Sequence, residues 1–319
     1  MPESTFKTPV LVLLGPTASG KTHLAVKVAA MLDGEIISAD SRQVYREMDI
    51  GTGKDLAEYE IDGRKIPYHL IDIRDAGEQY NVNEFQRDFE KEYHSVVEKE
   101  KTPILCGGTG FYILSLLKGH GYAAIPVNDA LRTELEAFPK ELLMTRFENY
   151  NTAYQQLADV STKKRLIRAI EISEFLTINP NQETLSFTDR KPYDYIVFGL
   201  NPAVELRRER ISKRFISRLE QGLIAEVQTL LSRGLTPEQL IYYGLEYKWI
   251  TLYLTGELDY KEMVTRLETE IHRFAKRQMT FFRKMEKDGI EIHWLDSECG
   301  ANEHAQRVVA DYQQFLKQN

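Results

Sequence analysis

The 319-residue chain has two cysteines, no long apolar run and no excess of basic residues, and each shortage excludes a class of protein. Cys106 and Cys299 are too few for a disulfide framework or a four-thiolate zinc site, which favours a reducing compartment. No segment approaches the roughly 18 apolar residues of a membrane span, and the opening residues MPEST lack the regions of a signal peptide. We therefore expect a cytoplasmic protein without a membrane partner.

Acidic residues outnumber basic residues by 48 to 41, a formal net charge of −7. A basic field over the whole protein is therefore excluded, and a nucleic acid would have to bind a local basic patch. Hydrophobic residues make up 42% and charged residues 28% of the chain, ordinary values for a folded globular protein.

Short apolar runs alternate with stretches of helical length over the first 120 residues. Val10–Leu14 (VLVLL) suits a strand covered on both faces, and further strands are predicted at residues 35–39, 68–73 and 103–106. Helices are predicted between them, at His23–Leu32 and Val82–Glu100. This alternation predicts an α/β fold with a mostly parallel sheet covered by helices.

The remaining chain predicts a helical insertion and a helical C-terminal region. A strand at Tyr195–Leu200 follows a largely helical stretch of about 121–194, which we interpret as an inserted helical subdomain. After Pro202 the chain is helical for most of its length, with a break at 234–237, an edge strand at 290–295 and a last helix at 302–318. Residues 1–120 and about 195–319 would then form one core.

Residues 15–22 (GPTASGKT) match the phosphate-binding pattern G-x-x-x-x-G-K-[ST] between a predicted strand and helix. Glycines let the backbone N–H groups wrap an anion, Lys21 adds positive charge, and Thr22 offers a hydroxyl to Mg²⁺. A glycine turn with a chance lysine is the alternative. We predict a P-loop NTPase-like fold in which a diphosphate group is bound by Gly15, Pro16, Thr17, Ala18, Ser19, Gly20, Lys21 and Thr22.

Two other strand ends carry polar residues. Asp40 follows the second predicted strand and Thr109 follows Gly107 and Gly108. The carboxyl ends of parallel strands face one crevice, so both side chains are expected beside the phosphate loop. Asp40 could hold magnesium or accept a proton there, or it could cap the next helix.

Six segments occur in an order that resembles one enzyme family. They are GPTASGKT, DSRQVY with MDIGTGK, YHLIDI, GGTGFY, RLIRAIEI and AKRQMTFFR. The sequence resembles the tRNA dimethylallyltransferases, also called tRNA isopentenyltransferases, from about Val10 to Asp296. This resemblance implies transfer of a dimethylallyl group from its diphosphate to N6 of adenosine 37, which follows the anticodon in tRNA, with release of diphosphate.

The resemblance also implies catalytic roles. Asp40 would be the general base, while Lys21, Thr22 with Mg²⁺, and an arginine would stabilise the leaving diphosphate. The family carries an R-x-x-x-R pattern, which matches Arg210 and Arg214 on one helix face, and we favour Arg214. A solvated basic face is the alternative.

Contacts with the tRNA anticodon stem-loop are implied in three regions. The target adenine must leave its stack to reach Asp40, and Ser41, Gln43 and Thr109 occupy positions that match the family's nucleotide-contacting residues. Residues 271–287 are rich in Lys and Arg with interleaved Phe, as an RNA surface requires, although a solvated helix face has the same pattern. The predicted tRNA-binding residues are Asp40, Ser41, Arg42, Gln43, Thr109, Lys164, Arg165, Arg168, Lys276, Arg277, Gln278 and Arg283.

Several positions depart from the family pattern. Glu246 stands where the family has the glycine of Gly-Tyr-Lys, His272-Arg273 replaces Arg-Gln, and Phe281 replaces tryptophan. We expect these changes on the RNA-facing side, so the substrate is less firmly implied than the reaction. The alternatives are an adenylate isopentenyltransferase acting on free AMP or ADP, a P-loop kinase of a small metabolite, and a non-catalytic RNA-binding module. We expect Mg²⁺ as cofactor and a monomeric protein.

Overall fold

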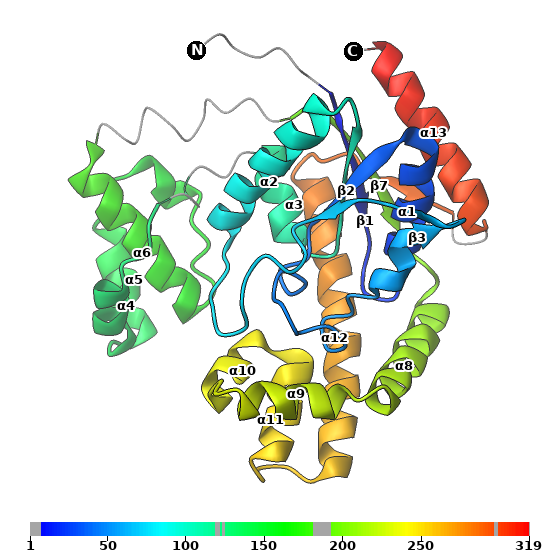
Figure 1. The fold of residues 1–319 in the computed structure, drawn as a ribbon. Helices are drawn as coiled ribbons and strands as arrows, with labels where there is room; N and C mark the ends of the chain where they lie inside the picture. Colours follow the sequence, from blue (N-terminus) through cyan, green and yellow to red (C-terminus); the bar gives the residue numbers. More distant parts are fainter. Residues whose placement is uncertain (1–7, 119–121, 123–124, 181–192, 297–298, 319) are drawn as a thin grey trace. The chain divides into compact units, whose positions relative to one another are not determined.

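The computed structural model describes residues 8–118, 122, 125–180, 193–296 and 299–318 (Figure 1). The chain divides into two compact units, one of Met1–Leu114 with Tyr193–Asn319 and one of Ser115–Pro192. No helix of the described residues is both long and apolar enough to cross a membrane.

The first unit contains a six-stranded sheet in which every pairing is parallel. The strand order is β5-β2-β6-β1-β7-β8. The strands are β1 (Val10–Leu14), β2 (Gly34–Ser38), β5 (Tyr68–His69), β6 (Thr102–Gly107), β7 (Tyr195–Leu200) and β8 (His293–Leu295). β1, β2 and β6 have almost no exposed residue, as expected for strands covered on both faces. The predicted α/β fold is confirmed.

Helices cover both faces of this sheet. α1 (Lys21–Leu32) and α13 (Ala301–Gln318) lie against one face, where Leu24 and Val308 share a core with Leu13, Ile36 and Phe198 (Figure 1). α2 (Val82–Glu98) contacts β2 and β6 and is fixed at its start by a capping box between Asn81 and Glu84. α3 (Gly110–Lys118) follows β6. The short elements η1 (Leu56–Tyr59), β3 (Glu60–Ile61) and β4 (Arg64–Lys65) complete this part.

One predicted strand is much shorter in the structure. The run 68–73 forms β5 at Tyr68–His69 only. Leu70 has φ 61° and Asp72 has φ 57°, both left-handed. Such residues cannot continue a β-ladder, so the apolar pattern overestimated the length of the strand.

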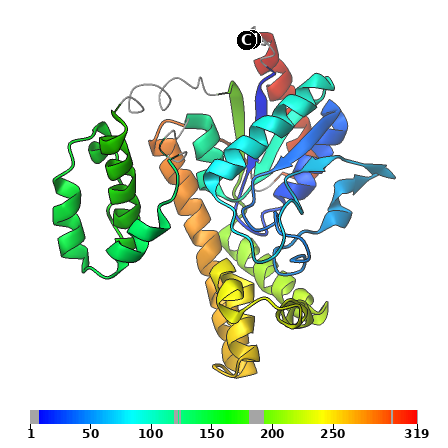
Figure 2. The same ribbon diagram turned by 60° about the vertical axis from the view of Figure 1, so that its left-hand side comes forward.

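The C-terminal helices of the first unit extend away from the sheet. They are α8 (Val204–Glu220), α9 (Leu223–Ser232), α10 (Pro237–Tyr243), α11 (Leu245–Leu254) and α12 (Tyr260–Lys287). Figure 2 shows that α12 is long and runs from the region of the sheet to α10 and α11. The predicted break before α10 is explained by Gly234, with φ 98°, and by the Thr236 capping box with Pro237 at the first helical position.

The second unit is helical. It contains α4 (Asp129–Glu136), α5 (Lys140–Glu148), η3 (Ala153–Gln156) and α6 (Lys163–Ile178). Leu135, Leu143, Phe147 and Leu166 form its own apolar core. The side chain of Thr162 caps α6 by accepting a hydrogen bond from the Arg165 N–H.

Candidate active site

A cavity of about 460 Å³ lies at the carboxyl ends of the parallel strands. Its walls include Thr17–Thr22 after β1, Asp40 after β2, Asn201 after β7 and Asp296 after β8. α8 and α12 complete the walls, while Gly15 and Pro16 are buried. Strand ends of an open parallel sheet are the usual place for a ligand, and here they bring the phosphate-binding loop and Asp40 to one cavity.

The phosphate-binding loop ends in a left-handed glycine at the start of α1. Gly20 has φ 87°, a conformation that glycine adopts without strain, and α1 begins at the next residue. Ser19 Oγ is buried and has no hydrogen-bond partner among the described residues. Buried hydroxyls are normally bonded, so this oxygen and the free N–H groups of the helix start point to a polar ligand.

Two distant helices hold the loop in place. Arg214 of α8 donates from Nη2 to Thr17 Oγ1 at 2.5 Å, and the Thr17 N–H donates to Gln278 Oε1 of α12 at 2.8 Å. Gln278 Nε2 donates to the Gly108 carbonyl at 2.9 Å. A Cβ at residue 108 would lie 2.4 Å from Gln278 Nε2, so a side chain there would displace the Gln278 amide from this contact. The buried Gln278, predicted to bind tRNA, thus joins the loop to the end of β6 in this structure.

The side of the cavity formed by α8 carries a cluster of cations, although acidic residues also line the cavity. Arg210, Arg214 and Arg218 are four residues apart on α8, and all three line the cavity. Burial, reinforced by Arg218, lowers the pKa of Arg214 to about 10. Burial also lowers the pKa of Lys21, against the opposing effects of Cys106 and Asp40. Clustered cations that are partly stripped of water favour an anionic ligand.

Asp40 starts a tight turn and does not cap a helix. Its Oδ1 accepts a hydrogen bond from the Arg42 N–H at 3.0 Å, and residues 41–44 form turns. The Ser41 N–H donates to Thr109 Oγ1 at 3.1 Å, and Gln43 Nε2 donates to the Gly53 carbonyl at 3.1 Å. Asp40, Ser41, Gln43 and Thr109 therefore lie together, as predicted, although their roles stay predictions.

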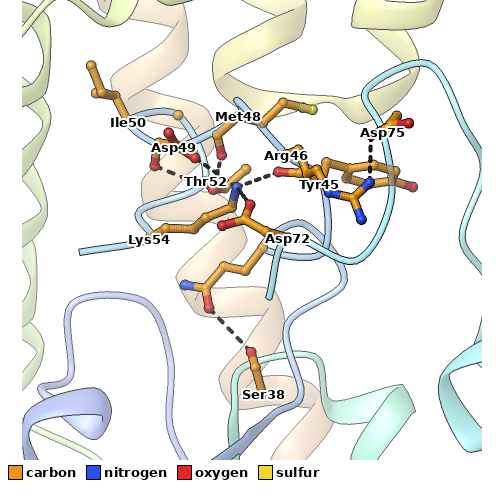
Figure 3. Close-up of polar contacts among 12 residues, drawn as sticks. Ser38, Tyr45, Arg46, Met48, Asp49, Ile50, Thr52, Lys54, Asp72 and Asp75 are labelled. Carbon is orange, nitrogen blue, oxygen red and sulfur yellow. Dashed lines mark hydrogen bonds and ion pairs between the residues drawn. The ribbon is translucent and has the colours of Figure 1, made fainter. Parts of the chain in front are cut away.

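The loop at residues 48–54 is held by a buried lysine (Figure 3). Lys54 Nζ donates to Asp49 Oδ1 at 2.8 Å, and also to Asp72 and to the Tyr45 carbonyl. The Lys54 side chain has no exposed surface, whereas Asp49 is 58% and Asp72 36% exposed. A buried ammonium group needs such partners, so the cluster holds Gly53 in place. The Gly53 carbonyl in turn accepts the hydrogen bond from the Gln43 side chain.

The same loop is also anchored to the C-terminal helices. The Glu226 carboxylate on α9 accepts hydrogen bonds from the N–H groups of Asp49, Ile50 and Gly51 at 2.7–3.0 Å. It also accepts one from the Tyr247 hydroxyl at 2.8 Å. This carboxylate therefore fixes the wall of the cavity that Gly51–Gly53 contribute.

We predict that the double variant Asp49→Asn, Asp72→Asn lowers the free energy of unfolding by about 3–5 kcal/mol, because it leaves the buried Lys54 ammonium group without a carboxylate. Urea unfolding followed by circular dichroism would measure the loss. Asp75→Asn is the matched control, since Asp75 is 73% exposed and its pair with the exposed Arg46 contributes at most about 1 kcal/mol. Equal stability of the double variant and the control would contradict the role assigned to Lys54.

The predicted RNA-binding residues of α12 lie on its exposed side, with the exception of Gln278. Lys276, Arg277 and Arg283 are exposed. Arg277 lies 3.7 Å from Glu270 and over the ring of Phe274. Of these three residues, Arg277 lines a groove of about 380 Å³, together with Arg42, Tyr243, Gly244, Leu245, Lys248, Trp249, Glu270 and Phe274. The groove shares Arg42, Leu245 and Phe274 with the main cavity.

The three predicted residues of the second unit differ in their surroundings. Lys164 is exposed, and Arg165 is exposed with Nη1 donating to Asp159 at 2.8 Å. The Arg168 guanidinium donates to Glu171 and to the Ile125 carbonyl, the latter at 2.7 Å, and thereby joins α6 to the segment before α4. Their contacts with RNA stay predictions.

The cavity suits a hard cation bound mainly through a ligand. In the described part of the chain, no group of three or more His, Cys, Asp or Glu side chains could hold a metal ion. The half-buried Thr22 hydroxyl and the Asp40 carboxylate are oxygen donors of the kind that Mg²⁺ prefers. Mg²⁺ is often held by one or two protein oxygens and by phosphate oxygens, so these residues fit.

Comparisons with known proteins agree with this geometry. The model of the IPP transferase family matches residues 43–285. tRNA dimethylallyltransferase 1 of Parabacteroides distasonis is 51% identical over 288 residues, which cover 90% of this chain and 92% of that protein. The chain belongs to the tRNA dimethylallyltransferase family. It is also similar to tRNA dimethylallyltransferase 2 of Bacteroides fragilis, 49% identical over 306 residues that cover 96% and 98% of the two chains.

A solved structure supports the family assignment. The crystal structure of the full-length tRNA isopentenylpyrophosphate transferase from Bacillus halodurans superposes with a TM-score of 0.71. The two sequences are 32% identical, and the match covers 98% of each chain. The resemblance inferred from the six sequence motifs is therefore confirmed, and the chain is an enzyme of this family.

Three residues were not assigned to this site from the sequence. Arg218 has a side-chain nitrogen, Nη2, that is buried without a hydrogen-bond partner among the described residues. Its spacing of four from Arg214 was the sequence signal that could have revealed it. Lys54 closes the MDIGTGK segment, which marked it as part of the family pattern but did not reveal its role. Glu226 had no sequence signal, because its partners come from elsewhere in the fold.

Proposed function

We propose that this tRNA dimethylallyltransferase family member transfers a dimethylallyl group from dimethylallyl diphosphate to N6 of adenosine 37 in tRNA. The observation that supports this most is a single cavity shared by the phosphate-binding loop, the arginine cluster of α8 and the Asp40 carboxylate. The loop suits the diphosphate of the donor, and Asp40 suits the acceptor amine. The printed names of the curated relatives assign tRNA dimethylallyl transfer to them.

On the donor side, the C–O bond to diphosphate breaks and negative charge grows on the leaving group. Lys21, Arg214 and the N–H groups at the start of α1 line the cavity where this charge would develop. Preorganised donors of this kind stabilise a transition state because they need no reorganisation. Mg²⁺ held by the Thr22 hydroxyl and diphosphate oxygens would supply further positive charge.

On the acceptor side, the C–N bond forms as the exocyclic amine of adenine loses a proton. Its lone pair is delocalised into the ring, so the amine is a weak nucleophile. Asp40 would orient the amine and take that proton as the bond forms. An adenine inside an anticodon loop has to be extruded from its stack to enter the cavity. The basic groove that shares Arg42 and Phe274 with the cavity would receive the flanking nucleotides.

The test is a transfer assay with the purified protein, Mg²⁺ and dimethylallyl diphosphate. We expect N6-dimethylallyladenosine at position 37 of an unmodified tRNA that carries adenosines at 36 and 37, identified by mass spectrometry of nucleosides. Transfer to AMP or ADP but not to this tRNA would support an adenylate isopentenyltransferase instead. ATP consumption with a small acceptor would support a kinase, and RNA binding without transfer a non-catalytic module.

The double variant Lys276→Ala, Arg277→Ala is expected to weaken tRNA binding and to reduce the slope of log K against log salt by about 2, since each lost phosphate contact removes about 1. kcat at saturating tRNA should change little. Arg307→Ala with Lys317→Ala removes two exposed cations of α13 and is the matched control. Equal salt slopes for the two double variants would contradict an RNA surface on α12.

A further inference from the structure

The Arg42 side chain meets a buried glutamate at the junction of α10 and α11. Nη1 of Arg42 donates to Glu246 Oε2 at 2.8 Å, and Nη2 donates to the Tyr243 carbonyl at 2.6 Å. The side chain of Arg42 is 17% exposed and that of Glu246 6%. Arg42 is the third residue of the DSRQVY segment, and Glu246 stands where the family pattern has glycine. A residue of this segment therefore pairs in space with a departure from the family pattern.

Arg42 connects this pair to the proposed general base. Its backbone N–H donates to Asp40 Oδ1 at 3.0 Å, so one residue contacts Glu246 through its side chain and Asp40 through its main chain. Arg42, Glu246 and Asp40 all line the cavity. Because the segment after Asp40 is made of turns and not of a helix or strand, its conformation depends on such tertiary contacts.

The junction that carries Glu246 is itself firmly held. The Tyr243 hydroxyl accepts the Gly77 N–H at 2.6 Å and donates to the Glu78 carbonyl at 3.1 Å. Its ring lies edge-on to Tyr45, with ring centroids 4.7 Å apart. Gly244 and Leu245 both have positive φ, which turns the chain sharply between the helices. These contacts hold the α10–α11 junction in place and therefore fix the position of Glu246 relative to Arg42.

We propose that Glu246, acting through Arg42, is a positioning residue that holds the Asp40 turn in the geometry needed for proton transfer. This inference rests on the proposed function, in which Asp40 receives the proton of the amine. A shift of the base by about 1 Å can cost up to about 100-fold in rate, so a side chain that fixes the turn acts on kcat. The binding of dimethylallyl diphosphate, which depends on the phosphate-binding loop, is not affected.

A double-mutant cycle of Glu246→Gln and Arg42→Met tests the pair, with kcat and KM measured for both substrates. We expect Glu246→Gln to lower kcat about 10-fold, to leave KM for dimethylallyl diphosphate unchanged, and to have no further effect in the Arg42→Met background. Glu238→Gln, which changes an exposed carboxylate on α10, is the matched control and should keep the wild-type kcat.

Two kinetic results would overturn the proposal. They are a wild-type kcat for Glu246→Gln, or an equal effect of Glu246→Gln with and without Arg42. A wild-type kcat together with tighter tRNA binding would mean that Glu246 competes with RNA for Arg42.

The amide hydrogen exchange rates of residues 41–43 test whether the pair holds the turn and do not require an activity assay. Faster exchange in Glu246→Gln than in Glu238→Gln is expected, and equal exchange overturns the proposal even where a variant is too unstable to assay. If the wild-type enzyme transferred no dimethylallyl group, the proposed function would fail and with it the role in proton transfer, whereas the exchange result would still show whether the pair holds the turn.

Discussion

Replacement of Asp40 by alanine is expected to lower kcat by about 10²- to 10⁴-fold, the usual contribution of a general base, while tRNA binding stays largely unchanged. Asp40 lines the same cavity as Lys21 and Thr22, and it is the residue that would receive the proton of the amine. Steady-state kinetics with saturating tRNA and dimethylallyl diphosphate would measure the loss, and filter binding would measure tRNA affinity.

Asp40→Asn separates proton transfer from the support of the turn. An asparagine keeps an oxygen that can accept the Arg42 N–H, so the turn should persist, but the amide cannot take a proton at neutral pH. We expect a loss of kcat similar to that of the alanine variant. Asp55→Asn is the control, because Asp55 is another carboxylate of the cavity wall. A wild-type rate for Asp40→Asn would remove Asp40 from its proposed role.

Replacement of Lys21 by methionine is expected to lower kcat by about 10²- to 10³-fold, the effect of losing one group that stabilises developing negative charge. Methionine preserves most of the volume of the lysine side chain but carries no charge. Lys27→Met on the same helix is the control, since Lys27 donates to Asn302 and does not line the cavity. Single-turnover kinetics at saturating donor would measure the chemical step. A change of KM without a change of kcat would contradict transition-state stabilisation by Lys21.

The pH dependence gives an independent test of Lys21. Burial lowers the pKa of this lysine in the free enzyme, so its proton is lost at a lower pH than that of an ordinary lysine. A bound diphosphate favours the charged form and raises the pKa again. The affinity for dimethylallyl diphosphate should therefore be full at neutral pH and fall as the pH rises through the pKa of free Lys21. In Lys21→Met this fall should be smaller, and the part that remains should follow Arg214, whose pKa is lowered to about 10.

Local sequence patterns were sufficient for the sheet and the phosphate-binding loop. The strand Val10–Leu14 and the following glycine-rich loop are determined by residues that are adjacent in the sequence, and the structure places both as expected. The position of Asp40 followed from a general rule, that the carboxyl ends of parallel strands face one crevice. The strand predicted at 68–73 was too long because positive φ at Leu70 and Asp72 leaves no mark in the apolar pattern.

Residues that act through tertiary contacts could not be predicted. Gln278 was assigned to RNA from its place in a basic helix, but it reaches Thr17 and Gly108 because α12 passes beside the strand ends. Glu226 receives the N–H groups of a loop that lies far away in the chain. Glu246 was noticed as a departure from the family pattern, but its partner became clear only when the fold placed Arg42 beside it.

The proposed reaction requires that one cavity holds the diphosphate at the phosphate-binding loop while Asp40 faces the acceptor amine. A crystal structure of the protein with an anticodon stem-loop and an unreactive thio analogue of the donor would show both. We expect the diphosphate on the N–H groups of residues 18–22, because the Thr17 N–H already donates to Gln278, and N6 of adenosine 37 within about 2.6–3.2 Å of an Asp40 oxygen. A structure in which the diphosphate lies elsewhere, or in which Asp40 points away from the adenine, would contradict it.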